Sequence, residues 1–478
     1  GGYNDPNSDS TKAYKYLQDV FKVEDPSVVL VVESNKAAND PTVFAEVAKL
    51  ESAIQSEARV GKTLSYWSTG GAPTLLSKDG KAGFLFIYSD KSDWGVIQQL
   101  GKEIQKKYDG KFENLKVYAS GTGVFAHAIN SKISSDLKLA ESISIPLTFI
   151  LLAFVFGGLV ASAMPLVVGV SAILGSFLII YLLTLFTGVS IFALNLITGL
   201  GLGLGIDYSL LIVNRFREEL HAGKSVEDSI VNTVTTAGKT VFYSGLTVVL
   251  TLVALIMFPQ MFLKSFGYAG VTVVIMAVLG ALIALPALLA MLGNKIDNVV
   301  VRKSAITPKE DGRWADTARF VMRKPISVVV LSLIILTVLA APIKNIVFSQ
   351  VDSRVLPDSN PAATAARVIL ERFPGQEGNP IEIIVPKGAF MGTQINQYTS
   401  EIAKVPGIVR IGDSQVAGDD VRVTAIHSMG PRTPEAQELI TKVRAIRAPE
   451  GTLIGGVAAD YTDTQDGIAA TLPWALLW

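Results

Sequence analysis

A single carboxylate stands within a long apolar stretch of the sequence. Asp207 follows the alternating stretch Gly199-Leu-Gly-Leu-Gly-Leu-Gly205, and the apolar run that contains it starts near Ile191. At about 1.5 Å per helical residue, Asp207 lies about 12 Å from Arg215, inside the hydrocarbon of a membrane-spanning helix. An ionised side chain there costs at least ~2.5 kcal/mol. We therefore expect Asp207 to be protonated, paired or directed at a polar cavity, and to be functional.

The chemistry open to such a carboxylate is reversible proton binding. Burial raises the pKa of a carboxyl group towards the working range, and Tyr208 could donate a hydrogen bond beside Asp207. Ser244, on the next apolar run, could extend this into a proton relay. Two plainer interpretations stay open: a neighbouring helix neutralises Asp207 for assembly only, and the Ser244 hydroxyl bonds back to its own helix.

Four glycines precede the carboxylate, namely Gly199, Gly201, Gly203 and Gly205. A dinucleotide-binding loop would need a strand before it in a soluble βαβ unit, whereas these glycines lie in a membrane-length run. Gly199 and Gly203 are four positions apart, as are Gly201 and Gly205, so they form two small-xxx-small pairs. We therefore predict that these glycines serve helix packing. Three Gly-Lys-Ser/Thr triplets elsewhere lack the earlier glycine of a phosphate-binding loop, and we expect no ATP handling.

The composition excludes several classes of function. Of the 478 residues, 49% are hydrophobic and 18% are charged, and the mean hydropathy of +0.41 lies above that of soluble proteins. The net charge of zero implies no bulk attraction to nucleic acid. The chain has no cysteine, and its three histidines form no metal-ligand motif. With no catalytic constellation in the polar segments, we expect a non-enzyme without metal or cofactor.

Six apolar runs are long enough to cross a bilayer. They cover residues 143–163, 165–186, 191–213, 240–258, 266–292 and 326–347. The links at 214–240 and 293–325 are rich in Lys and Arg, whereas the links at 187–190 and 259–265 hold one lysine between them. The positive-inside rule therefore places the basic links in the cytoplasm and both polar domains outside.

These runs divide the chain into six segments. The predicted boundaries are 1–141 for a first outside α+β domain, 142–292 for five membrane helices, 293–325 for a basic cytoplasmic linker, 326–347 for a membrane helix, 348–465 for a second outside α+β domain, and 466–478 for the start of another membrane helix.

Short strands and amphipathic helices alternate in the first outside domain, which predicts a layered βαβ-type module. The predicted helices are 10–21, 41–57 and 94–108, and the predicted strands are 28–32, 73–76, 82–89 and 115–119.

The second outside domain repeats the start of the first. A helical Ala-x3-Leu-x3-Phe stripe from Ala13 precedes the strand at 28–32, and an Ala-x3-Ile-x3-Phe stripe from Ala365 precedes a strand at 381–385. Such a pattern also arises by chance in βαβ folds. Two outside domains, each followed by a membrane segment, favour a duplication with a pseudo-twofold repeat.

A duplicated chain would carry further membrane helices. We expect a first helix before Gly1 and a second helix bundle after Trp478, and so interpret the sequence as a fragment or an incomplete chain.

Three segments resemble the MmpL proteins, large actinobacterial lipid transporters of the resistance–nodulation–division (RND) superfamily. The stretch Gly205-Ile-Asp-Tyr-Ser-Leu-Leu-Ile-Val-Asn-Arg-Phe-Arg-Glu-Glu219 is similar to their fourth-helix signature. Residues 1–10 resemble the start of their first periplasmic domain, and residues 258–265 resemble the turn between their fifth and sixth helices. The resemblance covers essentially the whole chain.

The resemblance implies a twelve-helix pump of the bacterial inner membrane, driven by the proton-motive force, with two periplasmic domains around an apolar lipid channel. In that family, an Asp-Tyr pair matching Asp207 and Tyr208 works with a second pair on the tenth helix, which this sequence lacks. A serine on the fifth helix matches Ser244. Family members similar in these motifs export trehalose monomycolate, and drug-efflux members of the superfamily carry an Asp-Asp pair instead.

The implied partners are therefore a lipid or glycolipid, protons and the membrane, with accessory envelope proteins as further candidates and no nucleic acid. Two other functions stay open. One is a non-transporting membrane scaffold or receptor of the same fold, in which Asp207→Asn would impair assembly alone. The other is an efflux pump for drugs or small amphiphiles.

Overall fold

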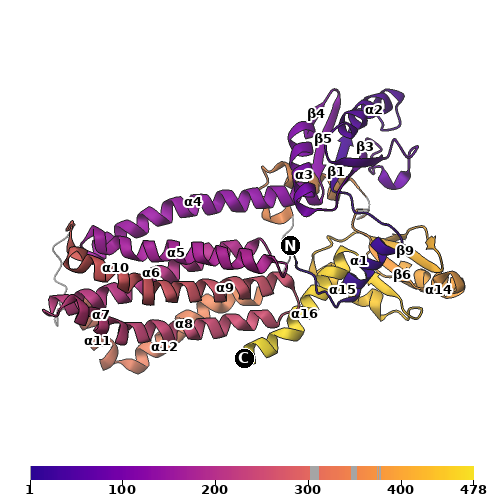
Figure 1. Cartoon of the computed structure of the whole chain (residues 1–478). Coiled ribbons are helices and arrows are strands. Elements are labelled where there is room, and N and C mark those ends of the chain that lie inside the picture. Colours follow the sequence, from indigo (N-terminus) through magenta and orange to yellow (C-terminus); the bar gives the residue numbers. More distant parts are fainter. Residues whose placement is uncertain (1, 302–311, 346–352, 374, 376–377) are drawn as a thin grey trace. The chain divides into compact units, whose positions relative to one another are not determined.

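The computed structural model describes residues 2–301, 312–345, 353–373, 375 and 378–478. The chain forms two compact units (Figure 1). The helical unit comprises residues 1–3, 140–348 and 470–478, and the sheet unit comprises residues 4–139 and 349–469. Most residues of both predicted outside domains therefore belong to one unit.

Long apolar helices build the helical unit. Among the described residues, six helical segments are long and apolar enough to cross a membrane, as the sequence predicts. The elements are α4 (Thr122–Phe156), α5 (Leu159–Thr184), α6 (Phe192–His221), α7 (Val226–Thr235), α8 (Ala237–Val253), η2 (Ala254–Met257), α9 (Met261–Leu279), η3 (Gly280–Ala284), α10 (Leu285–Leu292), η4 (Gly293–Asp297), α11 (Arg313–Arg323), α12 (Pro325–Ala340) and η5 (Ala341–Asn345).

Two clusters of buried apolar side chains hold this unit together. One includes Ile212 and Phe216 of α6 with Leu285 of α10, and the other joins Ile197 of α6 to Val273 of α9. α12 differs, because none of its residues is buried within the described chain. Its mostly apolar side chains suit a lipid environment.

The first two predicted spans have different limits in the structure. The sequence pattern placed their boundary near Pro165, but α4 ends at Phe156 and α5 begins at Leu159. The chain turns at Gly157, whose φ of +72° suits a residue without a side chain. Pro165 instead lies inside α5, so the proline is a poorer boundary signal here than the glycine.

The first sheet of the sheet unit is antiparallel and has the strand order β2-β3-β1-β5-β4. In the central strand, Leu30 pairs with Leu85 of β3 and Ala119 of β5. α2 connects β1 and β2, which have β3 between them, in the split βαβ arrangement. α3 leads from β3 to the short strand β4, which pairs with β5, and β1 lies between β3 and β5. Both helices contribute to the core, for example with Leu50 and Ile104. The bounds are α1 (Asp9–Asp19), β1 (Val28–Glu33), α2 (Pro41–Gln55), β2 (Val60–Ser65), η1 (Pro73–Leu75), β3 (Ala82–Ser89), α3 (Trp94–Tyr108), β4 (Gly110–Phe112) and β5 (Leu115–Ser120).

The second sheet has the same arrangement, with the order β10-β6-β9-β7 and β8 paired to β9. Ile383 of β6 pairs with Val423 and Ile454, and α14 and α15 again connect strands with a third between them. The shared order accords with a duplication, while the pseudo-twofold repeat stays a prediction. The bounds are η6 (Ser353–Val355), α13 (Pro361–Arg372), β6 (Ile381–Val385), η7 (Gly388–Phe390), α14 (Gly392–Ala403), β7 (Ile408–Ile411), β8 (Gln415–Ala417), β9 (Asp420–His427), α15 (Pro434–Ala445), β10 (Leu453–Gly455) and α16 (Val457–Leu477).

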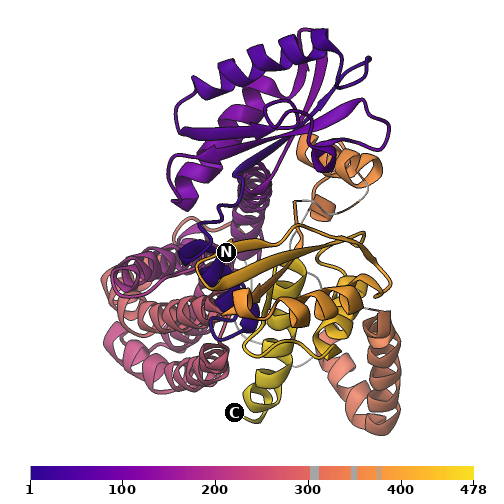
Figure 2. The same cartoon turned by 90° about the vertical axis from the view of Figure 1, so that its right-hand side faces the viewer.

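Each sheet is covered by a helix from the other half of the sequence. Ala13 and Leu17 of α1 pack against Ile384 of the second sheet. Phe373, which follows α13, stacks on Phe84 of the first sheet with 3.9 Å between ring centroids, and Figure 2 shows the orange α13 beside that sheet. The two predicted apolar stripes therefore lie on helices. The stripe of α1 packs against the second sheet, and the stripe of α13 packs against the first sheet.

One local prediction in the first domain needs correction, and the two edge strands β2 and β4 were missed. Residues 73–75 form the 3₁₀ helix η1 instead of a strand, because Pro73 lacks the N–H that a sheet ladder needs and suits a helix start. β2 was not predicted. Its edge position leaves most of its side chains partly or fully exposed, so its sequence has no clear apolar alternation.

Arg372 ties α13 to the first sheet. Its guanidinium lies 2.8 Å from the Glu33 carboxylate and 2.6 Å from the Asp79 carboxylate, and its side chain is only 19% exposed. Hydrogen bonds from Ser77 and then Arg372 lower the pKa of Asp79 to about 2. This lowered pKa favours the folded state above pH 3.8, the ordinary value for Asp, and the contribution is lost as the pH falls through about 2.

We predict that Arg372→Met lowers the free energy of unfolding by about 1–2 kcal/mol, because two adjacent carboxylates lose their shared cation while solvent screens part of the effect. Thermal unfolding in detergent between pH 5 and pH 8 measures it. Lys442→Met is the control, since Lys442 forms an exposed pair with Glu438. Equal changes in both variants would contradict this role for Arg372.

Asp460, near the start of α16, has a raised pKa. Burial, together with the nearby Asp463, raises its pKa to about 6 against an opposing effect of Arg432, and among the described residues its Oδ1 atom has no hydrogen-bond partner. The neutral form thus favours folding, and this contribution is lost as the pH rises through about 6.

We predict that Asp460→Asn raises the free energy of unfolding by about 2 kcal/mol at pH 7.5 and leaves it nearly unchanged at pH 4. Unfolding curves at the two pH values measure the difference. Asp466→Asn, at an exposed position of the same helix, should show no such dependence. A gain that is equal at both pH values would rule out the charge as its cause.

Candidate functional site

The packed face of α6 depends on two of the four glycines. A Cβ atom at Gly205 would lie 2.5 Å from the Cα atom of Gly169 on α5, and one at Gly201 would lie 2.6 Å from a side-chain carbon of Ile173. Real Cβ atoms do not approach so closely, so these glycines let α5 and α6 come together.

The carboxylate lies on a different face of α6. Asp207 is exposed, as are Gly199 and Gly203 at spacings of four residues before it. No described atom comes within 4 Å of a Cβ built on either glycine. Within the described chain, Asp207 has no hydrogen-bond or ion-pair partner. For Gly199 and Gly203, helix packing therefore stays a prediction.

Tyr208 points into the bundle, unlike its neighbour Asp207. It is 4% exposed and belongs to the same apolar cluster as Ile212 and Phe216. Its hydroxyl is buried and has no hydrogen-bond partner among the residues that the structure describes. A buried hydroxyl without a partner costs about 1–3 kcal/mol, which sets Tyr208 apart from the apolar residues around it.

The Tyr208 hydroxyl approaches α8 one residue away from the predicted relay serine. It lies 3.8 Å from the Cβ position of Gly245, a glycine that also allows close contact with Val278 of α9. Ser244 itself is exposed. In the part of the chain that the structure describes, no hydrogen bond joins Asp207, Tyr208 and Ser244, so the proton relay remains a prediction.

Sequence reasoning missed two polar features of α6. Ser209 is fully buried, and its hydroxyl has no hydrogen-bond partner within the described part of the chain; its place directly after Asp207 and Tyr208 was the available signal. Arg217 is 7% exposed and pairs with Asp297 at 2.7 Å. No spacing rule could reveal this pair, because eighty positions separate its members.

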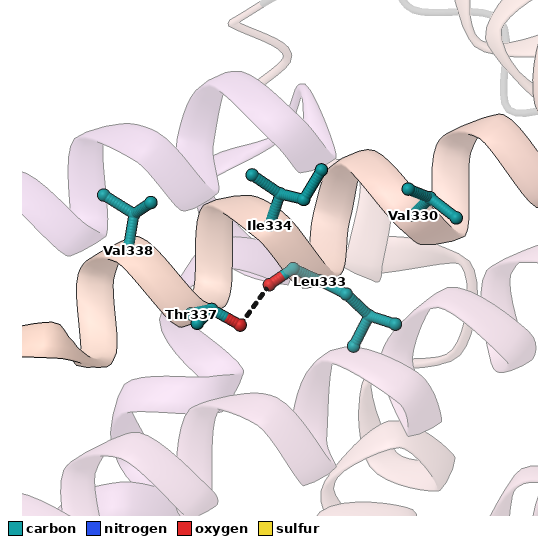
Figure 3. Close-up of a pocket in the computed structure, with 5 residues that line it drawn as sticks. All are labelled: Val330, Leu333, Ile334, Thr337 and Val338. Atoms are coloured by element: carbon teal, nitrogen blue, oxygen red, sulfur yellow. Dashed lines mark hydrogen bonds between the residues drawn. The ribbon is translucent and has the colours of Figure 1, made fainter.

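The remaining candidates for chemistry are few. No group of three or more His, Asp or Glu side chains that could hold a metal ion occurs among the described residues. A shallow groove of about 300 Å³ is lined by α12, but the hydroxyl of Thr337 donates to the backbone carbonyl of Leu333 at 2.8 Å (Figure 3). The groove lining is otherwise aliphatic and offers no further polar side chain. The groove residues are Val330, Leu333, Ile334, Thr337 and Val338.

Comparison with known proteins identifies the family of this chain. The family model described as the MMPL family matches residues 2–328, which is more than half of the chain. The chain belongs to the MMPL family. The predicted resemblance is thereby confirmed, and the six membrane-length apolar helices among its described residues make this MMPL chain a multi-pass membrane protein.

This MMPL chain is similar in sequence to several named proteins. It is 32% identical to a Streptomyces coelicolor chain named as membrane protein SCO6666, over 99% of this chain and 65% of the relative. It is 26% identical to the trehalose monomycolate exporter MmpL3 of Mycobacterium tuberculosis, over 99% of this chain and 55% of that protein. It is 30% identical to the mycolic acid-containing lipids exporter MmpL11 of Mycolicibacterium smegmatis, over 78% of this chain and 41% of that protein. The chain thus spans only part of the length of these relatives.

We predict that Gly205→Ala in this MMPL chain lowers the free energy of unfolding by about 1–3 kcal/mol, because the new methyl group overpacks the contact with Gly169. Thermal unfolding in detergent measures the change. Gly203→Ala is the matched control on the same helix, since no described atom lies within 4 Å of its Cβ position. Equal destabilisation by both would contradict the assignment of packing to one face.

Proposed function

We propose that this chain takes part in the proton-motive-force-driven export of a lipid or glycolipid across or out of the bacterial inner membrane. One observation carries the proposal: Asp207 lies exposed on a membrane-length apolar helix whose other face is packed. A carboxylate in that position is functional by default, because a purely structural helix gains nothing from it.

Protonation of Asp207 would supply the driving interaction. Ionised, the carboxylate requires a polar partner; protonated, it tolerates an apolar one. The energetic difference of at least ~2.5 kcal/mol corresponds to about a 60-fold bias between two packings of α6. Tyr208 would pass the change to α8, since its hydroxyl has no hydrogen-bond partner among the described residues and lies 3.8 Å from the Cβ position of Gly245. Ser244, directly before Gly245 on the same helix, would be a further relay group.

The proposed substrate is trehalose monomycolate or a related cell-envelope lipid. Support comes from the relatives that are named as exporters of trehalose monomycolate and of mycolic acid-containing lipids. Accessory envelope proteins are proposed as further partners.

The sheet unit is proposed to lie on the periplasmic side. The basic residues of the links after α6 and after η4 support this orientation through the positive-inside rule. Because α1 and α13 each cover the sheet of the other domain, the two domains would move together when the membrane helices move.

Asp207→Asn tests the function directly. We predict that lipid export from inverted vesicles or proteoliposomes with the full-length protein falls by at least about tenfold, because the residue no longer changes charge. Asp207→Glu should retain part of the activity. Asp136→Asn is the control, since Asp136 forms an exposed pair with Lys132.

Four outcomes separate the candidate functions. Loss of export with a normal amount of folded protein supports proton-driven transport. Full export by Asp207→Asn would contradict the proposal. Loss of folded protein without any proton dependence in the wild type would favour a membrane scaffold, and extrusion of small amphiphiles without lipid export would favour an efflux pump.

A further inference from the structure

The last turn of α6 is tied to the end of η4 by one carboxylate. Asp297 accepts a hydrogen bond from Nε of Arg217 at 2.7 Å with one oxygen. Its other oxygen lies 3.0 Å from Nε2 of His221. Both oxygens of Asp297 therefore bind α6, at positions one helical turn apart. We call these three residues the α6 clamp.

Arg217 is the buried member of the clamp. It is 7% exposed, and its guanidinium carbon lies 5.8 Å from the ring centroid of Phe156, the last residue of α4. A buried cation is strongly destabilising without its partner, and a cation near a helix C-terminus is favoured by the helix dipole. Asp297 is thus the group that allows Arg217 to stay buried between α4, α6 and η4.

His221 adds a second connection. Its Nδ1 atom lies 2.7 Å from the backbone carbonyl oxygen of Arg217, while Nε2 faces Asp297. A carbonyl and a carboxylate can only accept, so both contacts become hydrogen bonds when both ring nitrogens carry protons. The imidazole then bridges the backbone of α6 to the same carboxylate that holds Arg217.

The segment after Asp297 is itself attached to the bundle. The backbone N–H of Val301 donates to the carbonyl oxygen of Gly157 at 2.8 Å, and that of Leu159 donates to Val299 at 3.2 Å. These bonds connect the chain beyond η4 to the turn between α4 and α5. Asp297 is therefore a fixed anchor for α6 and is not part of a loose loop.

We propose that Asp297 is a positioning residue for transport, which through the α6 clamp sets the height and rotation at which α6 presents Asp207. Arg217 and Asp207 are ten positions apart on one continuous helix, about 15 Å along its axis. A rigid helix held at one end transmits that constraint to its middle. This inference rests on the proposed function of Asp207.

The experiment separates positioning from stability. Asp297→Asn leaves Arg217 buried without its full charge partner, so both the amount of folded protein and export should fall. The double variant Arg217→Met with Asp297→Met removes both charges, and replacing a buried ion pair by apolar side chains is often neutral for folding. We expect this double variant to unfold at the wild-type temperature.

We expect export by the full-length double variant to fall by at least about threefold, and the pH of half-maximal export to shift. Asp297→Glu, which keeps the carboxylate, should recover part of the rate and the wild-type pH profile. The control is Arg319→Met with Asp316→Met, which removes an exposed Arg–Asp pair on α11.

Wild-type export with a wild-type pH profile in the double variant would overturn the positioning role. So would a loss of export that merely follows a loss of folded protein in every clamp variant. Asp207→Asn is measured in parallel: full export there would overturn the proposed function and the clamp's role with it, whereas a failure confined to the clamp variants leaves the proposed function standing.

Discussion

A carboxylate in hydrocarbon must either lose its charge or find a polar partner, and α6 is arranged around that constraint. The helix needs one face for close packing, and Gly201 and Gly205 provide it by bringing α5 within contact distance. Asp207 lies on another face, where it touches no partner within the described chain. The carboxylate therefore lies outside the close contact between α5 and α6.

Tyr208 connects the two faces. Tyr208 directly follows Asp207 in the sequence, and its ring is buried among the apolar residues of the bundle. Its hydroxyl points towards α8. Towards the C-terminal end of the helix, Asp297 holds Arg217 and His221. α6 is therefore packed in its middle and anchored at one end. We propose that, in such an arrangement, a change at one side chain of α6 moves the neighbouring helices.

The sheet unit shows a second constraint. Neither sheet is fully covered by the helices that connect its own strands, and each takes its missing cover from the opposite half of the sequence. Phe373 stacks on Phe84, and Ala13 packs on the second sheet. Arg372 adds charge pairs to Glu33 and Asp79 at the same contact. The two domains consequently depend on each other for stability.

Much of this could be read from the sequence, and the exceptions have physical causes. The lengths of the apolar runs predicted the membrane spans, and α3 has the predicted limits of Trp94 and Tyr108. The edge strand β2 was missed because its side chains lack an apolar alternation. The crossed packing of α1 and α13 was missed because an apolar stripe specifies that a helix face is buried but not against which sheet.

For the candidate site, sequence identified the residue types but not their orientation. Hydropathy could single out Asp207, yet only the structure separates its exposed side chain from the buried Tyr208. The Arg217–Asp297 pair joins residues eighty positions apart, and no local pattern encodes such a contact. Periodicity describes one helix at a time, whereas these features depend on how helices meet.

The central claim is that Asp207 binds and releases a proton within the membrane. Infrared difference spectroscopy of the full-length protein in lipid tests it most directly, because a protonated carboxyl group has a carbonyl stretch distinct from that of a carboxylate. The account predicts a carboxyl band that titrates reversibly with pH and is absent from Asp207→Asn. A spectrum in which the variant retains every titrating carboxyl band of the wild type would contradict the claim.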